Sequence, residues 1–293
     1  MHHYLQQHPD VYLPATKSPS HFYCRNIAPD PDPAIRLVTQ NYFVPDPDDY
    51  RTLFDGVRHE TAIGEVSPAY LATVHAAPRI AKELPDVRLV AILRNPVDRV
   101  FARYVGRRRD GLESRPTLAA VIEEEDRLPL VRDVAVGTYL AAGCISHFLQ
   151  TYLDRFPRQQ LRVYLFEDLQ RDAAGLMRDL HAFLGVDPAF APDTDRRHNS
   201  SGGTIRNPAL RALWTQTALL RARARPYVPG AVREWVFGLI ARDPTPLLLD
   251  PEARAQLTAL YHDEVERLAT IIQRDLSHWL DPSSSTSDLR PPS

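Results

Sequence analysis

The sequence has little of several features that would narrow its class. Its two cysteines, Cys24 and Cys144, are too few for a disulfide framework, and neither stands in a metal-ligand spacing. No apolar run approaches the roughly 18 residues that a membrane span needs. The start, MHHYL, resembles neither a signal peptide nor a transit peptide. We therefore expect a protein of the reducing cytoplasm with no membrane span.

An excess of charge of one sign is also absent. The chain has 35 lysines and arginines against 37 aspartates and glutamates, a formal net charge of −2. No bulk field would therefore draw it to nucleic acid or to an anionic membrane. Lysine itself is scarce, with only Lys17 and Lys82 among the 35 basic residues. This bias reflects either a GC-rich genome or a supply of planar guanidinium groups suited to phosphate, sulfate and carboxylate.

What is present is ordinary for a globular protein. The chain has 293 residues, of which 44% are hydrophobic and 25% charged. That length can bury a full core in one large domain or in two modest ones. A tail rich in serine and proline follows residue 280, a composition typical of disorder. We expect one domain over residues 1–280 and a disordered tail over 281–293.

Strands and helices alternate in the first two thirds of the chain. The uninterrupted apolar run 87–93 is typical of a strand covered on both faces. Because a helix separates strands 61–66 and 87–93, we expect them to be parallel neighbours joined by a right-handed crossover. The pattern predicts strands over 61–66, 87–93 and 161–166, and helices over 1–7, 50–57, 69–84, 97–109, 118–128, 138–156, 173–184, 208–224, 229–242 and 251–275.

The apolar strand 87–93 is followed directly by Arg94, and an arginine-rich helix begins after Asn95 and Pro96. In an open parallel sheet, ligands bind beyond the carboxyl ends of the strands. A helix N-terminus together with a bidentate guanidinium forms an anion site best matched to phosphate. In the other interpretation, Arg94 pairs with an acidic residue at the surface. The local pattern alone leaves both open.

Five segments in register carry a resemblance that reaches over residues 1–280. The chain resembles sulfotransferases that use 3′-phosphoadenosine 5′-phosphosulfate, especially the heparan-sulfate type and its bacterial relatives. The segments are LQQHPDVYLPATKSPSHFY (5–23), IGEVSPAYL (63–71), LRNPVDRVFARY (93–104), FPRQQLRVYLFEDLQRD (156–172) followed by HAFLGVD, and LYHDEVERLATIIQRDLSHW (260–279).

The resemblance implies the fold in more detail. It indicates an α/β protein with a parallel sheet like that of P-loop NTPases, flanked by helices and followed by a helical C-terminal extension. In this family a Lys-x-Gly-Thr loop between the first strand and the first helix cradles the leaving phosphate. That loop should lie just upstream of Met1, so we expect the chain to be truncated N-terminally and to lack the central first strand.

The resemblance also assigns residues to the donor co-substrate, 3′-phosphoadenosine 5′-phosphosulfate. Arg94 would bind its 3′-phosphate, while Ala102 replaces a serine that shares this phosphate in the family. A loop of small residues would cover the same phosphate, unless it only connects two helices. Its candidate contacts are Ser201, Gly202, Gly203 and Arg206.

The acid–base residues of the family are altered in this chain. Pro19, or Ser18 with a loop one residue longer, stands at the position of the catalytic glutamate, and Val66 replaces a lysine. Two candidates remain to handle the acceptor's proton. Glu65 follows a strand and could accept the proton or orient a group that does, whereas His21 titrates near neutrality. Purely structural roles in capping and packing stay open for both.

The resemblance implies transfer of a sulfuryl group to a hydroxyl or amine of a small-molecule or glycan acceptor, with a carbohydrate favoured and no metal required. A second interpretation is an inactive protein of the same fold that binds the nucleotide or an acidic partner without turnover. A third, nucleic-acid binding through the arginine-rich helix, is disfavoured by the balanced charge. The sequence leaves the acceptor's identity and the oligomeric state open.

Overall fold

The computed structural model describes residues 1–14, 20–24, 44–110, 112–125, 139–194 and 248–282, with isolated residues between 210 and 236. The chain divides into two compact units. Unit 1 comprises Met1–Ile27, Tyr42–Arg94 and His147–His198, and unit 2 comprises Ala28–Asn41, Asn95–Ser146 and Asn199–Ser293. Within the described ranges, no helix is long and apolar enough to cross a membrane. The single domain over 1–280 and the disordered tail stay predictions.

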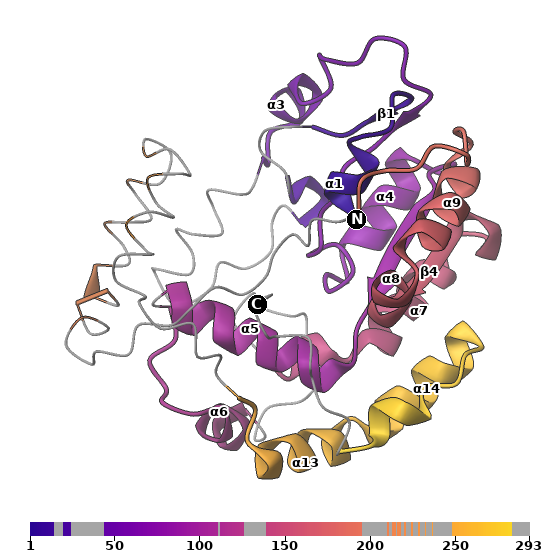
Figure 1. The fold of residues 1–293 in the computed structure, drawn as a ribbon. Helices are drawn as coiled ribbons and strands as arrows, with labels where there is room; N and C mark the ends of the chain where they lie inside the picture. The colour runs from indigo at the N-terminus through magenta and orange to yellow at the C-terminus, as the bar shows by residue number, and fades with distance from the viewer. Residues whose placement is uncertain are drawn as a thin grey trace. The chain divides into compact units, whose positions relative to one another are not determined.

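Unit 1 contains all the strands of the described chain and the helices around them (Figure 1). Its elements are α1 (His2–Leu5), β1 (Val11–Tyr12), η1 (Phe22–Cys24), α3 (Pro47–Thr52), β2 (Ala62–Ile63), α4 (Ala76–Glu83), β3 (Leu89–Leu93), η3 (Arg158–Gln160), β4 (Leu161–Leu165), α8 (Phe166–Arg171) and α9 (Ala173–Leu184).

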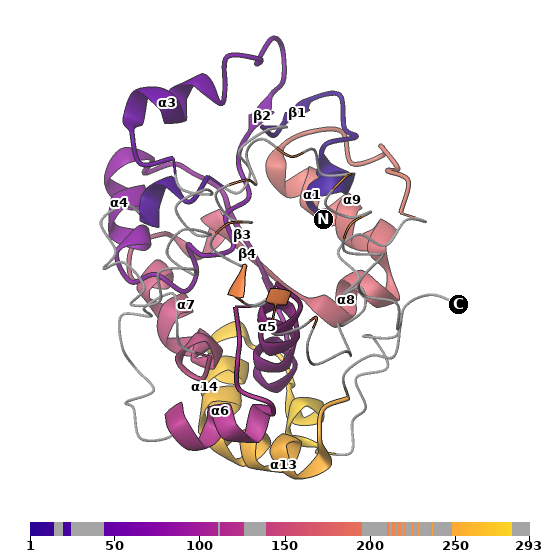
Figure 2. The same ribbon diagram turned by 90° about the vertical axis from the view of Figure 1, so that its left-hand side faces the viewer.

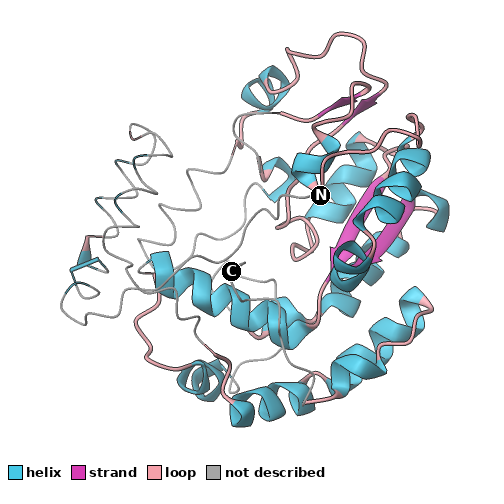
Figure 3. Cartoon of the chain, in the orientation of Figure 1, coloured by secondary structure: helices cyan, strands magenta, loops and turns pink. Residues whose placement is uncertain are grey.

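The described part of unit 2 is helical, as the cyan ribbon of Figure 3 shows. Helix α7 (Ile145–Leu153) begins in unit 2 and continues into unit 1. The other elements of unit 2 are α5 (Pro96–Asp110), α6 (Leu118–Glu125), η2 (Ala141–Gly143), α13 (Pro251–Leu260), α14 (His262–Ile272) and η5 (Ser277–Leu280).

All described strand pairs are parallel, so the α/β class is confirmed. Strands β3 and β4 lie side by side (Figure 2), in register from Leu89 opposite Leu161 to Leu93 opposite Leu165. Strand β2 pairs with β1 and not with β3. The prediction that strands 61–66 and 87–93 are neighbours was therefore wrong. Chain order alone suggested that pairing, whereas β2 is only two residues long and forms its ladder with the equally short β1.

The side chains of β3 are less covered than its apolar run suggested. Only Leu93 is buried, and the four preceding side chains are partly exposed. The apolar run predicted the strand correctly, but complete coverage of both faces was wrong for the described structure. Its single described partner, β4, explains part of this difference, because a strand in the middle of a wide sheet is covered more fully.

Helix α4 begins seven residues later than the pattern predicted. Pro78 lies in its first turn, where its missing N–H is not needed. A helix that started at residue 69 would bring the proline ring against the carbonyl group of Val74 and lose a hydrogen bond. Turns therefore occupy residues 68–72, and the helix runs from Ala76 to Glu83.

Two long predicted helices are interrupted. Cys144 has a ψ angle of 61°, which separates η2 from α7 within the predicted helix 138–156. Tyr261, with φ −95° and ψ 8°, separates α13 from α14 within the predicted helix 251–275. The short helix α8 was not predicted. The predicted helices 208–224 and 229–242 fall almost wholly outside the described residues.

Two apolar clusters hold unit 1 together. One joins α1, β1 and α9 through residues that include Tyr4, Val11 and Leu180. The other joins η1, α4 and the C-terminal part of α7 through Phe22, Ala77 and Tyr152, among others. The second cluster includes Phe22 and Tyr23 and so holds the segment that follows His21, one of the predicted site residues.

Candidate active site

Glu65 lies two residues after β2, and its carboxylate accepts hydrogen bonds from four hydroxyl groups. Tyr50 and Tyr70 donate to Oε1 at 2.8 and 2.6 Å. Ser67 donates to Oε2 at 3.1 Å, and Ser20 makes a short hydrogen bond to the same oxygen. A carboxylate has about four lone-pair positions, so these donors fill its capacity. We call the five residues the Glu65 cluster.

The Glu65 cluster also binds the backbone of the segment that follows Ser20. The N–H of His21 donates to Ser67 Oγ at 3.2 Å. The N–H of Phe22 donates to Ser20 Oγ at 3.4 Å, and that of Tyr23 to the Tyr70 hydroxyl at 3.3 Å. Three consecutive amides therefore contact hydroxyl groups that in turn donate to one carboxylate.

His21 sits in the left-handed backbone region, with a φ angle of 50°. Residues other than glycine adopt this conformation rarely, at a cost of order 1–3 kcal/mol, and such residues concentrate at functional sites. Burial of the imidazole lowers the pKa of His21 to about 4. The side chain is therefore neutral near pH 7 and holds a lone pair that can accept a proton.

Aromatic rings pack around the same carboxylate. The rings of Phe22 and Tyr50 stack with centroids 4.0 Å apart and an interplanar angle of 7°. Tyr23 and Tyr70 meet edge to face at 5.5 Å. Burial, reinforced by the charge of Glu65, raises the pKa of Tyr50 and of Tyr70, so both phenols keep their protons and act as donors.

Arg94 stands where the sequence predicted it, directly after the last residue of β3, and is partly buried. Its guanidinium lies over the ring of Phe166, 5.0 Å from the centroid. No carboxylate in the described part of the chain forms an ion pair with it, so the acidic partner of the second interpretation is not found there. A cation–π contact is made by the face of the guanidinium and does not use its in-plane N–H donors.

The N-terminus of α5 is partly satisfied by its own capping residue. Asn95 accepts from the Val97 N–H through Oδ1 at 2.9 Å and donates to the Trp279 carbonyl oxygen at 3.2 Å. One of the amides expected to face an anion is therefore already bound. The remaining predicted donor contacts, Ser201, Gly202, Gly203 and Arg206, lie outside the described residues.

The hydroxyl partners of Glu65 were not predicted from the sequence. Ser67 and Tyr70 could have been identified from the sequence, since they follow Glu65 by two and five residues in the same segment. Ser20 lies beside the predicted His21. Tyr50 gave no signal, because it comes from α3 and nothing in the local pattern links that helix to residue 65.

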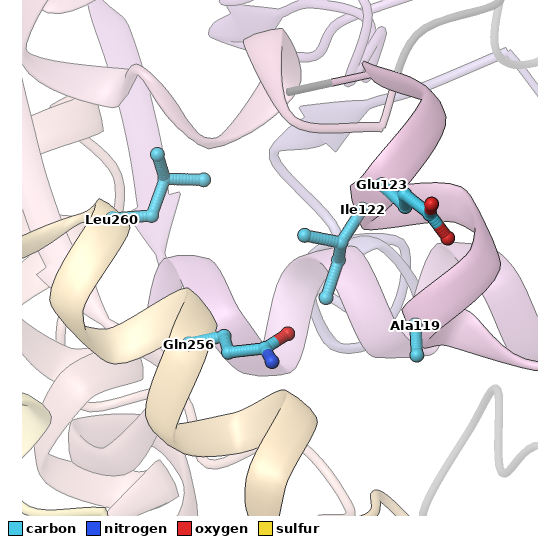
Figure 4. A pocket seen from close by; sticks show the side chains of 5 residues that line it. All are labelled: Ala119, Ile122, Glu123, Gln256 and Leu260. Carbon is cyan, nitrogen blue, oxygen red and sulfur yellow. The ribbon is translucent and has the colours of Figure 1, made fainter. Parts of the chain in front are cut away.

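A cavity of about 560 Å³ lies in unit 2 between α6 and α13 (Figure 4). The apolar side chains of Ile122 and Leu260 point toward it, and its polar groups are those of Glu123 and Gln256. Ala119 also lines the cavity, and none of these five residues is a cation. This lining does not suit an anionic nucleotide, and it includes none of the predicted site residues.

Comparisons with known proteins agree with this arrangement. A model described as "Sulfotransferase family" matches residues 1–191. A solved structure of a sulfotransferase from Alicyclobacillus acidocaldarius has a TM-score of 0.68 and 30% identity. The alignment covers 96% of this chain and 92% of that one. The likeness therefore extends over almost the whole of both proteins.

Curated relatives match shorter stretches. The human bifunctional heparan sulfate N-deacetylase/N-sulfotransferase 2 is 29% identical over 126 residues, which are 42% of this chain and 14% of the relative. The mouse heparan sulfate glucosamine 3-O-sulfotransferase 3A1 is 27% identical over 139 residues, 47% of this chain and 34% of the relative. The matches thus cover only about a third or less of these relatives' own length.

Proposed function

Because the chain belongs to the sulfotransferase family, we propose that it transfers a sulfuryl group from 3′-phosphoadenosine 5′-phosphosulfate to a hydroxyl or amine. The bond between sulfur and the donor's phosphate oxygen breaks, and sulfur bonds to the acceptor's oxygen or nitrogen. The acceptor's proton passes to a base of the protein, and 3′-phosphoadenosine 5′-phosphate leaves. Positioning and electrostatic stabilisation would supply most of the catalysis, as in phosphoryl transfer.

The observation that carries this proposal is the environment of Arg94. A partly buried guanidinium at the carboxyl end of a parallel strand, stacked on Phe166 and with no described acidic partner, fits a phosphate group. We assign it to the 3′-phosphate of the donor. Ser201, Gly202, Gly203 and Arg206 are proposed as further contacts to the nucleotide.

The proton of the acceptor has two candidate destinations, His21 and Glu65. His21 supports the role through its neutral imidazole in a strained backbone conformation. Glu65 follows β2, and its carboxylate accepts hydrogen bonds from four hydroxyls. It could accept the proton itself or orient the group that does. Both residues belong to unit 1 and are joined through Ser67.

We propose a carbohydrate as the acceptor. The names of the curated relatives refer to heparan sulfate and glucosamine, and their matches to this chain are 27–29% identical. Identity at this level supports a glycan as the first acceptor to test. It does not select which hydroxyl or amine of the sugar receives the group.

The test combines binding and turnover. Calorimetry with 3′-phosphoadenosine 5′-phosphate should detect a complex with the parent protein. Incubation with sulfur-labelled donor and a panel of glycans and amino sugars should move the label into one of them. If the protein neither binds the nucleotide nor transfers the label, the proposal is overturned. Binding without transfer would support the alternative, a nucleotide-binding protein of this fold without turnover.

A further inference from the structure

The Glu65 cluster contains more hydrogen bonds than a carboxylate needs to accept a proton. Each of three hydroxyls, those of Ser20, Ser67 and Tyr70, accepts a backbone N–H and donates its own hydrogen to Glu65. A hydroxyl has a single hydrogen. Each of these three hydroxyls donates that hydrogen to the carboxylate, and its oxygen keeps lone pairs that accept from the amide. The direction of donation is therefore the same for all three.

The three amides belong to consecutive residues, His21, Phe22 and Tyr23, at the start of η1. The first N–H groups of a helical turn have no partner within the turn and need an external acceptor. Ordinarily one capping side chain supplies it. Here the negative charge of Glu65 acts through hydroxyls that stand between the carboxylate and the amides.

The same arrangement argues against Glu65 as the group that takes the acceptor's proton. Both carboxylate oxygens already accept two hydrogen bonds each. A proton on either oxygen would displace a hydroxyl donor, and that hydroxyl would then lose its acceptor inside a packed aromatic cluster. Hydrogen bonds to an ionised group contribute more to stability than hydrogen bonds between neutral groups.

We propose that Glu65 is a positioning residue, which holds His21 in its left-handed conformation through Ser67, Ser20 and Tyr70, and that His21 receives the acceptor's proton. This inference rests on the proposed sulfuryl transfer for its catalytic half. Its structural half, the dependence of the turn 20–24 on the Glu65 carboxylate, stands on the hydrogen bonds alone. A displacement of about 1 Å in a catalytic group can cost about 10²-fold in rate.

The decisive variant for the structural half is Glu65→Gln, which keeps the size of the side chain. Its single carbonyl oxygen can accept two hydroxyls, while its NH₂ group faces the other two, which must turn away. Amide hydrogen exchange in a peptide that spans residues 20–24 should then accelerate by about tenfold or more. Exchange at the parental rate would overturn the proposal.

A pair of smaller changes separates anchoring from general packing. Ser67→Ala removes the hydroxyl that connects Glu65 to the His21 amide. Tyr50→Phe removes a donor to Glu65 for which no contact with the turn's amides is found in the described structure. Exchange at residues 20–24 should accelerate more in Ser67→Ala than in Tyr50→Phe. The reverse order would contradict an anchor that works through the amides.

Kinetics test the catalytic half. His21→Ala should lower kcat by about 10²–10⁴-fold, with partial recovery in added imidazole. Glu65→Gln should lower kcat by about 10²-fold but keep the limb of the pH–rate profile on which activity rises with pH. Loss of that limb in Glu65→Gln and its retention in His21→Ala would overturn the assignment. A parent protein with no turnover would refute the proposed function, while exchange would still decide the positioning role.

Discussion

The ring of Tyr261 lies against the α-carbon of Gly143, and its hydroxyl donates to the carbonyl oxygen of Leu140 at 2.7 Å. A Cβ at position 143 would overlap the ring. The hydrogen bond keeps Tyr261 from moving aside, and the residue is almost completely buried. This contact therefore links the turn before α7 to the junction of α13 and α14.

Gly143→Ala should accordingly destabilise the protein by about 1–3 kcal/mol, the usual cost of overpacking a core. Denaturation in urea would measure the change. Gly106→Ala is the matched control, because nothing lies within 4 Å of a Cβ there. It sits inside α5, where alanine is favoured over glycine by about 1 kcal/mol, so this variant should be more stable than the parent. Equal stability of both variants would contradict the contact.

Glu113 predicts a second stability difference. Its buried carboxylate accepts from Arg115 at 2.7 and 2.9 Å and from the Tyr139 hydroxyl at 2.6 Å. Burial alone would raise the pKa of Glu113, but the hydrogen bonds from Arg115 and Tyr139 outweigh it and lower the pKa to about 2. The stabilisation is therefore present above the unfolded pKa of about 4.5 and is lost as the pH falls toward 2.

Glu113→Gln should cost about 3 kcal/mol at pH 7, because it leaves the buried side of Arg115 without its counter-charge. Glu124→Gln serves as control, since Glu124 contacts the same arginine at 3.0 Å from a side chain that is 70% exposed. That change should cost less than about 1 kcal/mol. Thermal or urea denaturation of both variants at pH 7 would show whether burial, rather than the ion pair itself, sets the difference.

The sequence allowed some elements to be predicted closely. Helices α5 and α9 and strand β4 agree with their predicted ranges within one residue, because apolar periodicity and local caps define them. Arg94 at the end of β3 followed from the same local pattern. Each of these features depends on a single continuous segment, which is the information that one sequence provides.

The features that were not predicted depend on residues far apart in the sequence. Strand β1 has two residues in a stretch rich in proline and aspartate, so it shows no period, and its pairing with β2 depends on residues about 50 positions away. The partners of Glu65 come from three separate segments. Long-range contacts of this kind arise from tertiary packing, and no local pattern specifies them.

Arg94 gives a direct prediction for ligand binding. Arg94→Ala should weaken the affinity for 3′-phosphoadenosine 5′-phosphate by about 10–100-fold, the equivalent of one charge-assisted hydrogen-bonded contact. Arg94→Lys should fall between the two, because lysine keeps the charge but lacks the planar fork. Calorimetry would measure all three proteins.

Arg51→Ala provides the comparison for Arg94→Ala. Arg51 also belongs to unit 1, but its side chain is 75% exposed and pairs with Asp48 at 2.6 Å. Its removal should leave the nucleotide affinity at the parental value. An Arg94→Ala protein that binds as tightly as the parent would refute the assignment of Arg94 to the phosphate, whatever the activity of the protein.

His21 predicts how stability depends on pH. Its folded pKa of about 4 lies below the unfolded value of about 6.5, so the unfolded chain binds more protons between these values. Its imidazole therefore costs no stability above about pH 7, and the penalty grows as the pH falls toward 4. Between pH 7.5 and pH 5, this group alone should lower the free energy of unfolding by about 2 kcal/mol.

His21→Asn isolates that contribution, because asparagine does not titrate and tolerates the left-handed backbone at residue 21. His181 is fully buried and its pKa is also lowered, chiefly by burial, so the parent should lose further stability from the same acidification. The informative quantity is therefore the difference between the two proteins in urea denaturation at pH 7.5 and pH 5. His21→Asn should lose about 2 kcal/mol less than the parent over this interval, and equal losses would mean that the imidazole is protonated as readily in the folded protein as in the unfolded chain.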